Sequence, residues 1–220
     1  MTGIMPKILP LENGDRITRA EFERRYDAMP NLKKAELIEG VVYMGSPVRV
    51  IHGTPHALIM AWLGIYWIAT PGVNLADNTT VRLAPDNEPQ PDVLLRIEIG
   101  GQSTISEDSY VEGAPEFIAE IAASSASYDL REKLRVYCRN GVQEYLIWQV
   151  YNQRVDWFRL RSGEYVALST DVGIIRSEIF PGLWLSVPAL VAGNLVEVQS
   201  VLQMGLATPE HQAFVEQLGN

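Results

Sequence analysis

The chain has 220 residues, 47% of them hydrophobic and 20% charged, so it is long enough to bury a sizeable core. Its formal net charge of −9 argues against broad, non-specific coating of nucleic acid, although a local basic strip beside an acidic site is compatible with it. The single cysteine, Cys138, excludes an intrachain disulfide and is typical of a reducing cytoplasm, where we expect the protein. The richest apolar run, residues 57–70, is too short for a membrane span and the N-terminus lacks a signal-peptide pattern, so no membrane partner is expected.

The first half of the chain is expected to hold two helices and a hairpin, followed by strands. Thr18-Arg19-Ala20-Glu21 matches a capping box, which predicts a helix to about Asp27. A hairpin or a bent strand is predicted over residues 36–44 around Gly40, and a strongly apolar helix follows over residues 52–69. Strands are predicted at about residues 73–76, 79–84, 91–97, 116–122 and 142–150, with a polar loop over residues 98–112.

The second half alternates helix and strand. Asp129-x-x-Glu132 predicts the start of a helix over residues 130–140, and Asn140-Gly141 predicts its end. A hairpin over residues 154–168 should turn at Ser162-Gly163. Two further helices are expected, at 188–204 and from Pro209 onward. This order predicts an α/β fold with a mixed sheet flanked by helices and antiparallel edges.

Three parts are expected along the chain. Residues 1–15 read as a flexible N-terminal arm, and residues 16–190 as one α/β domain. Residues 191–220 read as helices that pack on this domain or lie at an interface, and their apolar character would suit a homodimer.

Lys133 is the most informative residue, because it faces the apolar side of its predicted helix. Leu130, Leu134, Tyr137 and Cys138 form one apolar stripe, and Lys133 falls within that stripe. A buried ammonium is costly unless a carboxylate or phosphate meets it. Arg131, Arg135 and Arg139 form a separate row, which is either a basic strip or a solvated helix face.

Two carboxylates in apolar strands are candidate partners for this lysine. Asp92 follows Pro91 at the head of one apolar run, and Glu120 stands among apolar neighbours in another. Carboxylates on neighbouring strands can hold Mg²⁺ or Mn²⁺, and such an ion activates water and neutralises charge on a phosphate. Asp92, Glu120 and Lys133 are therefore candidate catalytic residues, with Asp92 and Glu120 as metal ligands. The competing interpretations are a turn residue at Asp92 and a purely structural ion pair between Glu120 and Lys133.

Glu36, Glu39 and His52 are further candidates. Glu36 and Glu39 point to opposite faces of a strand, so at most one joins the site; Glu36 is the expected member, and Glu39 beside Gly40 reads as a turn residue. His52 either orients a water or a carboxylate, or packs at the start of its helix.

An ordered set of short motifs spans roughly residues 30–190. It consists of Glu36-Leu37-Ile38-Glu39-Gly40, Ser46-Pro47 with His52, Pro91-Asp92-Val93, Gly113-Ala114-Pro115-Glu116-Phe117-Ile118-Ala119-Glu120, Tyr128-Asp129-Leu130-Arg131-Glu132-Lys133-Leu134 with Tyr137, Gly141-Val142-Gln143-Glu144-Tyr145 and Pro181-Gly182-Leu183-Trp184-Leu185. Each motif alone is weak, but the ordered set resembles the Uma-two-type endonuclease family of the PD-(D/E)XK restriction-endonuclease-like superfamily.

The resemblance implies a restriction-endonuclease-like mixed sheet with a C-terminal helical extension, and a Mg²⁺- or Mn²⁺-dependent endonuclease acting on DNA. One departure matters: the superfamily's lysine usually follows the glutamate by two positions, where this chain has Ala122. The family places the lysine on the following helix, and Lys133 fits that position. The alternative is a non-catalytic binding or assembly protein that retains the nuclease fold.

Overall fold

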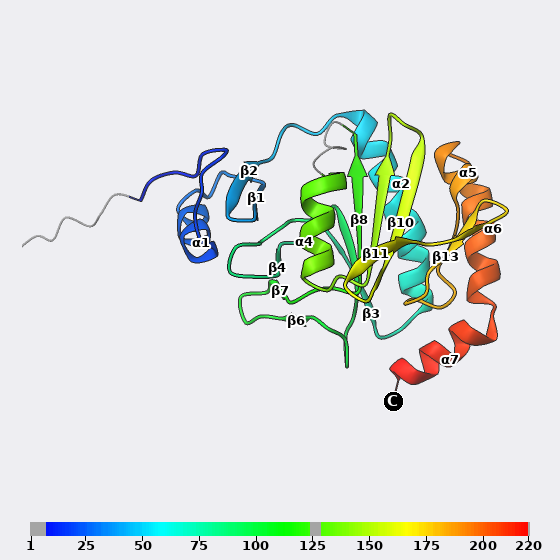
Figure 1. Ribbon diagram of the computed structural model, residues 1–220. Helices are drawn as coiled ribbons and strands as arrows, with labels where there is room; N and C mark the ends of the chain where they lie inside the picture. The colour runs from blue at the N-terminus through cyan, green and yellow to red at the C-terminus, as the bar shows by residue number, and fades with distance from the viewer. Residues whose placement is uncertain (1–7, 124–128, 220) are drawn as a thin grey trace, which may run out of the picture.

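The computed structural model describes residues 8–123 and 129–219, and it is organised around a six-stranded mixed sheet (Figure 1). The strand order is β11-β10-β9-β8-β5-β3. Only β8 and β9 run parallel; the other neighbours are antiparallel. The strands are β3 (Val73–Asp77), β5 (Val93–Ile97), β8 (Phe117–Ala122), β9 (Glu144–Gln149), β10 (Arg154–Arg161) and β11 (Glu164–Ala167).

Both faces of this sheet are covered, which is why its central strands are buried along their whole length. Phe117, Ala119 and Ile121 of β8 join the larger core, under helix α2 (Val50–Ala69) and the C-terminal helices. Ile118 and Ala122 join the smaller core, under helix α4 (Leu134–Arg139). Figure 1 shows α4 in front of β8 and β9, with α2 behind them. The predicted mixed α/β sheet flanked by helices is therefore confirmed.

The connection from β8 to β9 differs from the regular helix predicted over residues 130–140. Residues 129–133 form a π-helical turn (η1, Asp129–Lys133), and α4 begins only at Leu134. A π turn contains one extra residue compared with an α turn, and such turns concentrate at functional sites. Lys133 therefore lies at the junction of the two helix types. The predicted C-terminal signal is confirmed, because Gly141 has a φ of 88° directly after α4.

An N-terminal unit lies beside the sheet. Helix α1 (Arg19–Asp27) is capped by the Thr18 side chain, as predicted. The hairpin of β1 (Ala35–Ile38) and β2 (Val41–Met44) turns through Glu39 and Gly40, both with positive φ, also as predicted. Leu11 is buried against this unit with Phe22 and Leu37. Of the predicted arm, residues 1–7 lie outside the described part of the chain, whereas residues 8–15 include this buried leucine.

Two small sheets complete the fold, and the sequence did not predict most of their strands. The expected polar loop contains β6 (Thr104–Ile105) and β7 (Val111–Glu112), and β7 pairs with β6 on one side and with β4 (Val81–Arg82) on the other. A second sheet joins β12 (Thr170–Asp171), β13 (Ile174–Arg176) and β14 (Trp184–Ser186). These strands are two or three residues long, too short to show a period-two pattern.

The C-terminal region contains three helices rather than two. The predicted helix over residues 188–204 is broken into α5 (Val187–Val191) and α6 (Leu195–Leu206), followed by α7 (Pro209–Leu218). Gly193, with a φ of 71°, ends the first piece, and the Asn194 side chain caps the second. Val198 and Leu202 of α6 join the larger core. Within the described residues, no helix is both long and apolar enough to cross a membrane.

Candidate active site

Asp92 and Glu120 lie opposite one another on one face of the sheet. Asp92 lies one residue before β5. The antiparallel β5–β8 register pairs Val93 with Ala119, so the next pair along this register is Asp92 with Glu120. This is the face covered by α4, since the flanking Leu94 and Ile118 belong to the smaller core. Both carboxylates are buried, with 5% and 3% of each residue exposed. The two candidate carboxylates thus come from different strands to one place.

Asp92 is held by three groups and stays ionised. Its Oδ2 accepts a hydrogen bond of 2.8 Å from the backbone N–H of Ile121 and lies 3.2 Å from His52 Nε2. Its Oδ1 lies 3.7 Å from Lys34 Nζ. Burial alone would raise the pKa of Asp92, but the hydrogen bond from His52 and the charges of Lys34 and Lys133 outweigh it and hold the pKa well below its usual range.

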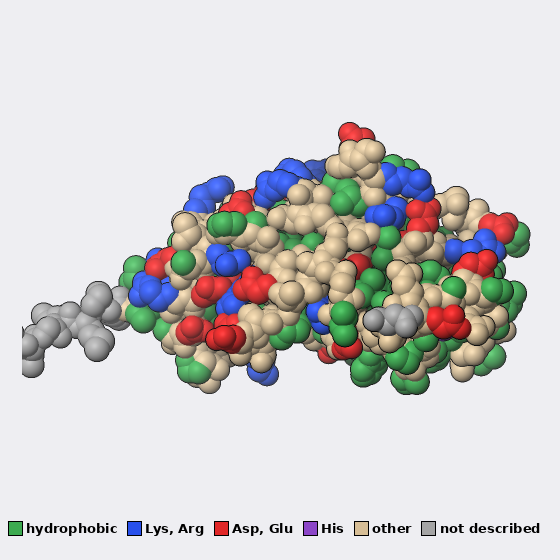
Figure 2. Space-filling model, turned by 90° about the horizontal axis from the view of Figure 1, so that it is seen from below, with side chains coloured by type: hydrophobic (Ala, Val, Ile, Leu, Met, Phe, Trp, Pro, Cys, Tyr) green, Lys and Arg blue, Asp and Glu red, His purple; other side chains and the backbone are tan. Residues whose placement is uncertain are grey.

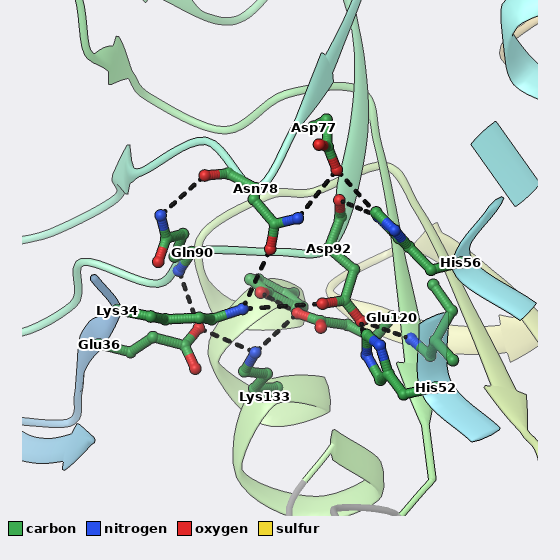
Figure 3. A network of polar contacts seen from close by, with 12 residues as sticks. Lys34, Glu36, His52, His56, Asp77, Asn78, Gln90, Asp92, Glu120 and Lys133 are labelled. Atoms are coloured by element: carbon green, nitrogen blue, oxygen red, sulfur yellow. Dashed lines mark hydrogen bonds and ion pairs between the residues drawn. The ribbon is translucent and has the colours of Figure 1, made fainter. Parts of the chain in front are cut away.

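Lys133 joins Glu120 to Glu36. Its ammonium lies 2.8 Å from Glu120 Oε1 and 2.9 Å from Glu36 Oε1, with only 3% of the lysine exposed (Figure 3). The Tyr137 hydroxyl, one turn further along α4, donates to the same Glu120 oxygen at 2.8 Å. Glu36 Oε1 also accepts from the backbone N–H of Gln90 at 2.8 Å. The side chain of Lys133 therefore points inward, as expected.

Glu39 lies in the hairpin turn, as predicted, and it pairs with arginines outside this cluster. Arg135 pairs with both oxygens of Glu39, and Arg139 Nη1 lies 3.3 Å from its Oε1. The hydrogen bond from Arg135 lowers the pKa of Glu39. Two members of the arginine row are therefore neutralised by a carboxylate, which weakens the row as a basic strip. On the face seen in Figure 2, basic and acidic side chains lie intermixed.

A second set of polar residues supports the cluster, and sequence reasoning missed most of it. Lys34 Nζ lies 3.5 Å from Asn78 Oδ1 as well as near Asp92. His56 lies 2.9 Å from Asp77 Oδ1 and 3.2 Å from the Asp92 carbonyl (Figure 3). One signal was available: His52 and His56 stand four residues apart, so they share a helix face, where their rings stack 5.9 Å apart.

Other buried carboxylates serve the backbone instead of cations. Glu116 accepts from the N–H groups of Ile97 and Gln102. Glu144 accepts from Trp157 Nε1, from the Ser177 hydroxyl and from two backbone N–H groups. These contacts hold loops against the sheet. The acids around Lys133 differ, because their partners also include ammonium and imidazole groups.

The donor set suits a hard divalent cation, although it is small. Among residues 8–123 and 129–219, no group of three or more His, Cys, Asp or Glu side chains is arranged to hold a metal ion. Mg²⁺ needs fewer protein ligands than that, because it keeps several waters and commonly binds through one or two carboxylates. Asp92 and Glu120 supply two carboxylates on one face, with Asp92 ionised at neutral pH. The residues present therefore fit such an ion.

Comparisons with known proteins agree with this architecture. The family model Uma2, described as "Putative restriction endonuclease", matches residues 19–188. A solved structure, titled as that of "a putative nuclease belonging to DUF820" from Anabaena variabilis, is similar with a TM-score of 0.61. The similarity covers 80% of this chain and 98% of that chain at 16% identity, so it shows the fold alone. Among curated proteins none matches.

Proposed function

The chain belongs to the Uma2 family of restriction-endonuclease-like proteins, and on that premise we propose that it is a DNA endonuclease dependent on Mg²⁺ or Mn²⁺. The observation that carries the proposal is the buried Lys133, bonded to Glu120 on the face that also holds the ionised Asp92. A buried cation between carboxylates is costly to maintain for stability alone, because hydrophobic replacements are often neutral or stabilising. The cluster is therefore better explained by chemistry than by folding.

Asp92 and Glu120 are the proposed metal ligands. A bound divalent ion would supply acidification of a water molecule and neutralisation of charge on the scissile phosphate. His52 and the Ile121 N–H fix the orientation of the Asp92 carboxylate, and Tyr137 fixes that of Glu120. These groups act as positioning residues, because they reach the reacting atoms only through the two carboxylates.

Lys133 and Lys34 are the proposed cations at the reacting phosphate. In hydrolysis a water oxygen forms a bond to phosphorus while the bond to the leaving oxygen breaks, and that oxygen takes up a proton. Negative charge grows on the phosphoryl oxygens during this step, and preorganised ammonium groups stabilise it. Lys133 is held rigidly by Glu36 and Glu120, whereas Lys34 is 30% exposed and stands nearer the solvent. Glu36 thus orients Lys133 in this proposal.

The alternative is a binding or assembly protein that keeps the nuclease fold. Lys133 bridges two carboxylates at hydrogen-bond distance, which is also what a purely structural ion cluster requires. The net charge of −9 favours this alternative, since it opposes association with DNA. Activity measurements decide between the two.

The deciding experiment measures cleavage of single-stranded, duplex and branched DNA with Mg²⁺ or Mn²⁺. Wild-type protein should cleave at least one substrate, and chelation should stop the reaction. Glu120→Gln keeps the side-chain shape but removes a metal-binding charge, and Lys133→Met keeps the stem but removes the ammonium; each should abolish cleavage.

Glu144→Gln is the matched control, because it also replaces a buried carboxylate on the sheet but lies outside the cluster. It should lower the melting temperature and retain cleavage in proportion to the folded fraction. If wild-type protein cleaves none of the substrates with either metal, the cluster is a structural one and the binding-protein alternative holds.

A further inference from the structure

A cavity of about 210 Å³ lies between α1, the first strand of the hairpin and the small β4-β7-β6 sheet. None of its lining residues belongs to the polar cluster around Asp92, Glu120 and Lys133. Four carboxyl side chains and one guanidinium line it: Glu23, Asp27, Glu88 and Asp108 face Arg82. The cavity is smaller than sites that hold drug-sized ligands, so its occupant must be small.

Glu88 is the informative residue in this cavity. Only 5% of it is exposed, and no hydrogen-bond donor in the described part of the chain reaches its Oε2. A buried acceptor left without a donor is costly, and such groups are rare in folded proteins. Burial raises the pKa of Glu88 to about 8, and the charge of the neighbouring Glu23 carboxyl and a hydrogen bond with it add to this effect, whereas Arg82 and Arg19 oppose it. At neutral pH Glu88 therefore keeps a proton that it shares with Glu23, and no N–H donor pairs with its Oε2 in the described residues.

Arg82 does not supply that partner, because it forms ion pairs with three other carboxylates, although its buried Nε makes no hydrogen bond within the described residues. Its Nε lies 2.8 Å from Glu23 Oε1, its Nη2 lies 2.8 Å from Asp108 Oδ2, and its Nη1 lies 3.2 Å from Glu112 Oε1. Its guanidinium also stacks over the Tyr110 ring at 4.3 Å. One cation thus serves three carboxylates, and negative charge remains in excess around the cavity.

Aromatic rings form the rest of the lining. Phe22, Tyr26 and Tyr110 contribute their side chains to the wall. Aromatic faces attract cations that have lost part of their hydration, and they also contact short aliphatic chains. One kind of ligand would match the excess of carboxylate groups, the aromatic wall and the buried Glu88 carboxyl. This ligand is a compact cation that carries N–H groups.

We propose that this cavity binds a small aliphatic primary amine, whose ammonium group donates to Glu88 while its carbon chain lies against the aromatic wall. A primary ammonium has three donors and fits a place where several carboxylates converge. A quaternary ammonium would leave the Glu88 oxygen without a donor. A metal ion is a poorer occupant, because it has no carbon chain to lie against the aromatic wall.

Isothermal titration calorimetry with putrescine as the probe tests the proposal on the full-length protein. Wild-type protein should bind it saturably, whereas butane-1,4-diol, which has the same chain length and no charge, should not bind. Binding an ammonium favours the ionised form of Glu88, so it should release up to about one proton at pH 7. Titrations in two buffers of different ionisation enthalpy measure this release.

Two variants and a matched control make the test specific. Glu88→Gln should weaken putrescine binding by about ten- to a hundredfold and abolish the proton release. Asp27→Asn removes a charge at the exposed rim, should weaken binding by a few-fold, and remains informative if Glu88→Gln fails to fold. Glu107→Gln removes the same charge from a residue outside the cavity and should leave binding unchanged.

Three outcomes would overturn the proposal. These are a lack of saturable putrescine binding, equal binding of the diol, and equal weakening by Glu107→Gln and Glu88→Gln. The last result would show attraction to the acidic surface as a whole. None of these outcomes depends on DNA cleavage, so the proposal stands or falls separately from the nuclease function.

Discussion

Replacing Lys133 with methionine removes the only ammonium within 3 Å of both Glu36 and Glu120 among the described residues. Methionine matches the length and apolar character of the lysine stem, so the packing of the chain beside α4 should change little. What changes is the charge balance, because two buried carboxylates lose their shared partner.

Breaking a buried ion pair by removing one partner costs roughly 3–5 kcal/mol, because an uncompensated charge stays in the interior. We expect a loss of this size in the free energy of unfolding at neutral pH. For a domain of 150–250 residues, 1 kcal/mol corresponds to about 2–4 °C, so the melting temperature should fall by roughly 6–20 °C. The loss should shrink in acid, since a protonated carboxyl leaves no charge stranded.

Urea unfolding followed by circular dichroism measures the change, with Lys34→Met as the matched control. Lys34 also contacts a buried carboxylate, but at 3.7 Å and with 30% of its side chain exposed. Exposed pairs contribute about 0.2–1 kcal/mol, so Lys34→Met should be nearly neutral for stability. Equal, small losses in the two variants would refute the reasoning, because they would mean that the buried carboxylates adapt without their ammonium. A double variant with Glu120→Gln should lose less than the sum of the single losses.

Three further predictions follow from contacts around the sheet. Burial raises the pKa of Glu144 from 4.5 to about 7, so the folded state binds this proton more tightly and the free energy of unfolding should fall as pH rises between these values. Chemical denaturation across this range should show that decline in wild type and not in Glu144→Gln, and a parallel decline in both would contradict the assignment. His52→Leu removes the hydrogen bond that holds down the pKa of Asp92, so carbon-13 NMR should show this carboxyl titrating at higher pH; an unchanged titration would mean that the lysines suffice. Tyr137→Phe removes one donor to Glu120 and should cost about 1.5–3 kcal/mol in urea unfolding, and a neutral result would show that the oxygen finds another donor.

The local pattern of the chain predicted much of the fold. Capping boxes, apolar periodicity and glycine turns located α1, α2, the two hairpins and the central strands. They could not locate β6, β7 or the β12-β13-β14 sheet, because such short strands exist only through their pairing. Gly193 and Asn194 are residue types that favour helix ends, but the apolar residues on both sides made one continuous helix the expectation.

The candidate site was predictable where one element determines it. The helical pattern around Lys133 already placed its ammonium inward, and a buried ammonium needs an acid. The pairing of Asp92 with Glu120 depends on the register between β5 and β8, which no local pattern encodes. Lys34 and Gln90 were missed for the same reason, since they reach the cluster through the docking of the hairpin and a loop.

The route of the chain through the cluster also determines when the cluster can form. Glu120 and Lys133 are 13 residues apart, on the two ends of one strand-to-helix connection, so their contact can form early during folding. The hairpin residues contact α4 across a much longer stretch of the chain, as the sequence separation of 96 between Glu39 and Arg135 illustrates. Because the hairpin is synthesised first, it must wait for α4 to leave the ribosome before Glu36 can meet Lys133. A nascent or truncated chain would thus carry the residues of the cluster without their assembled geometry.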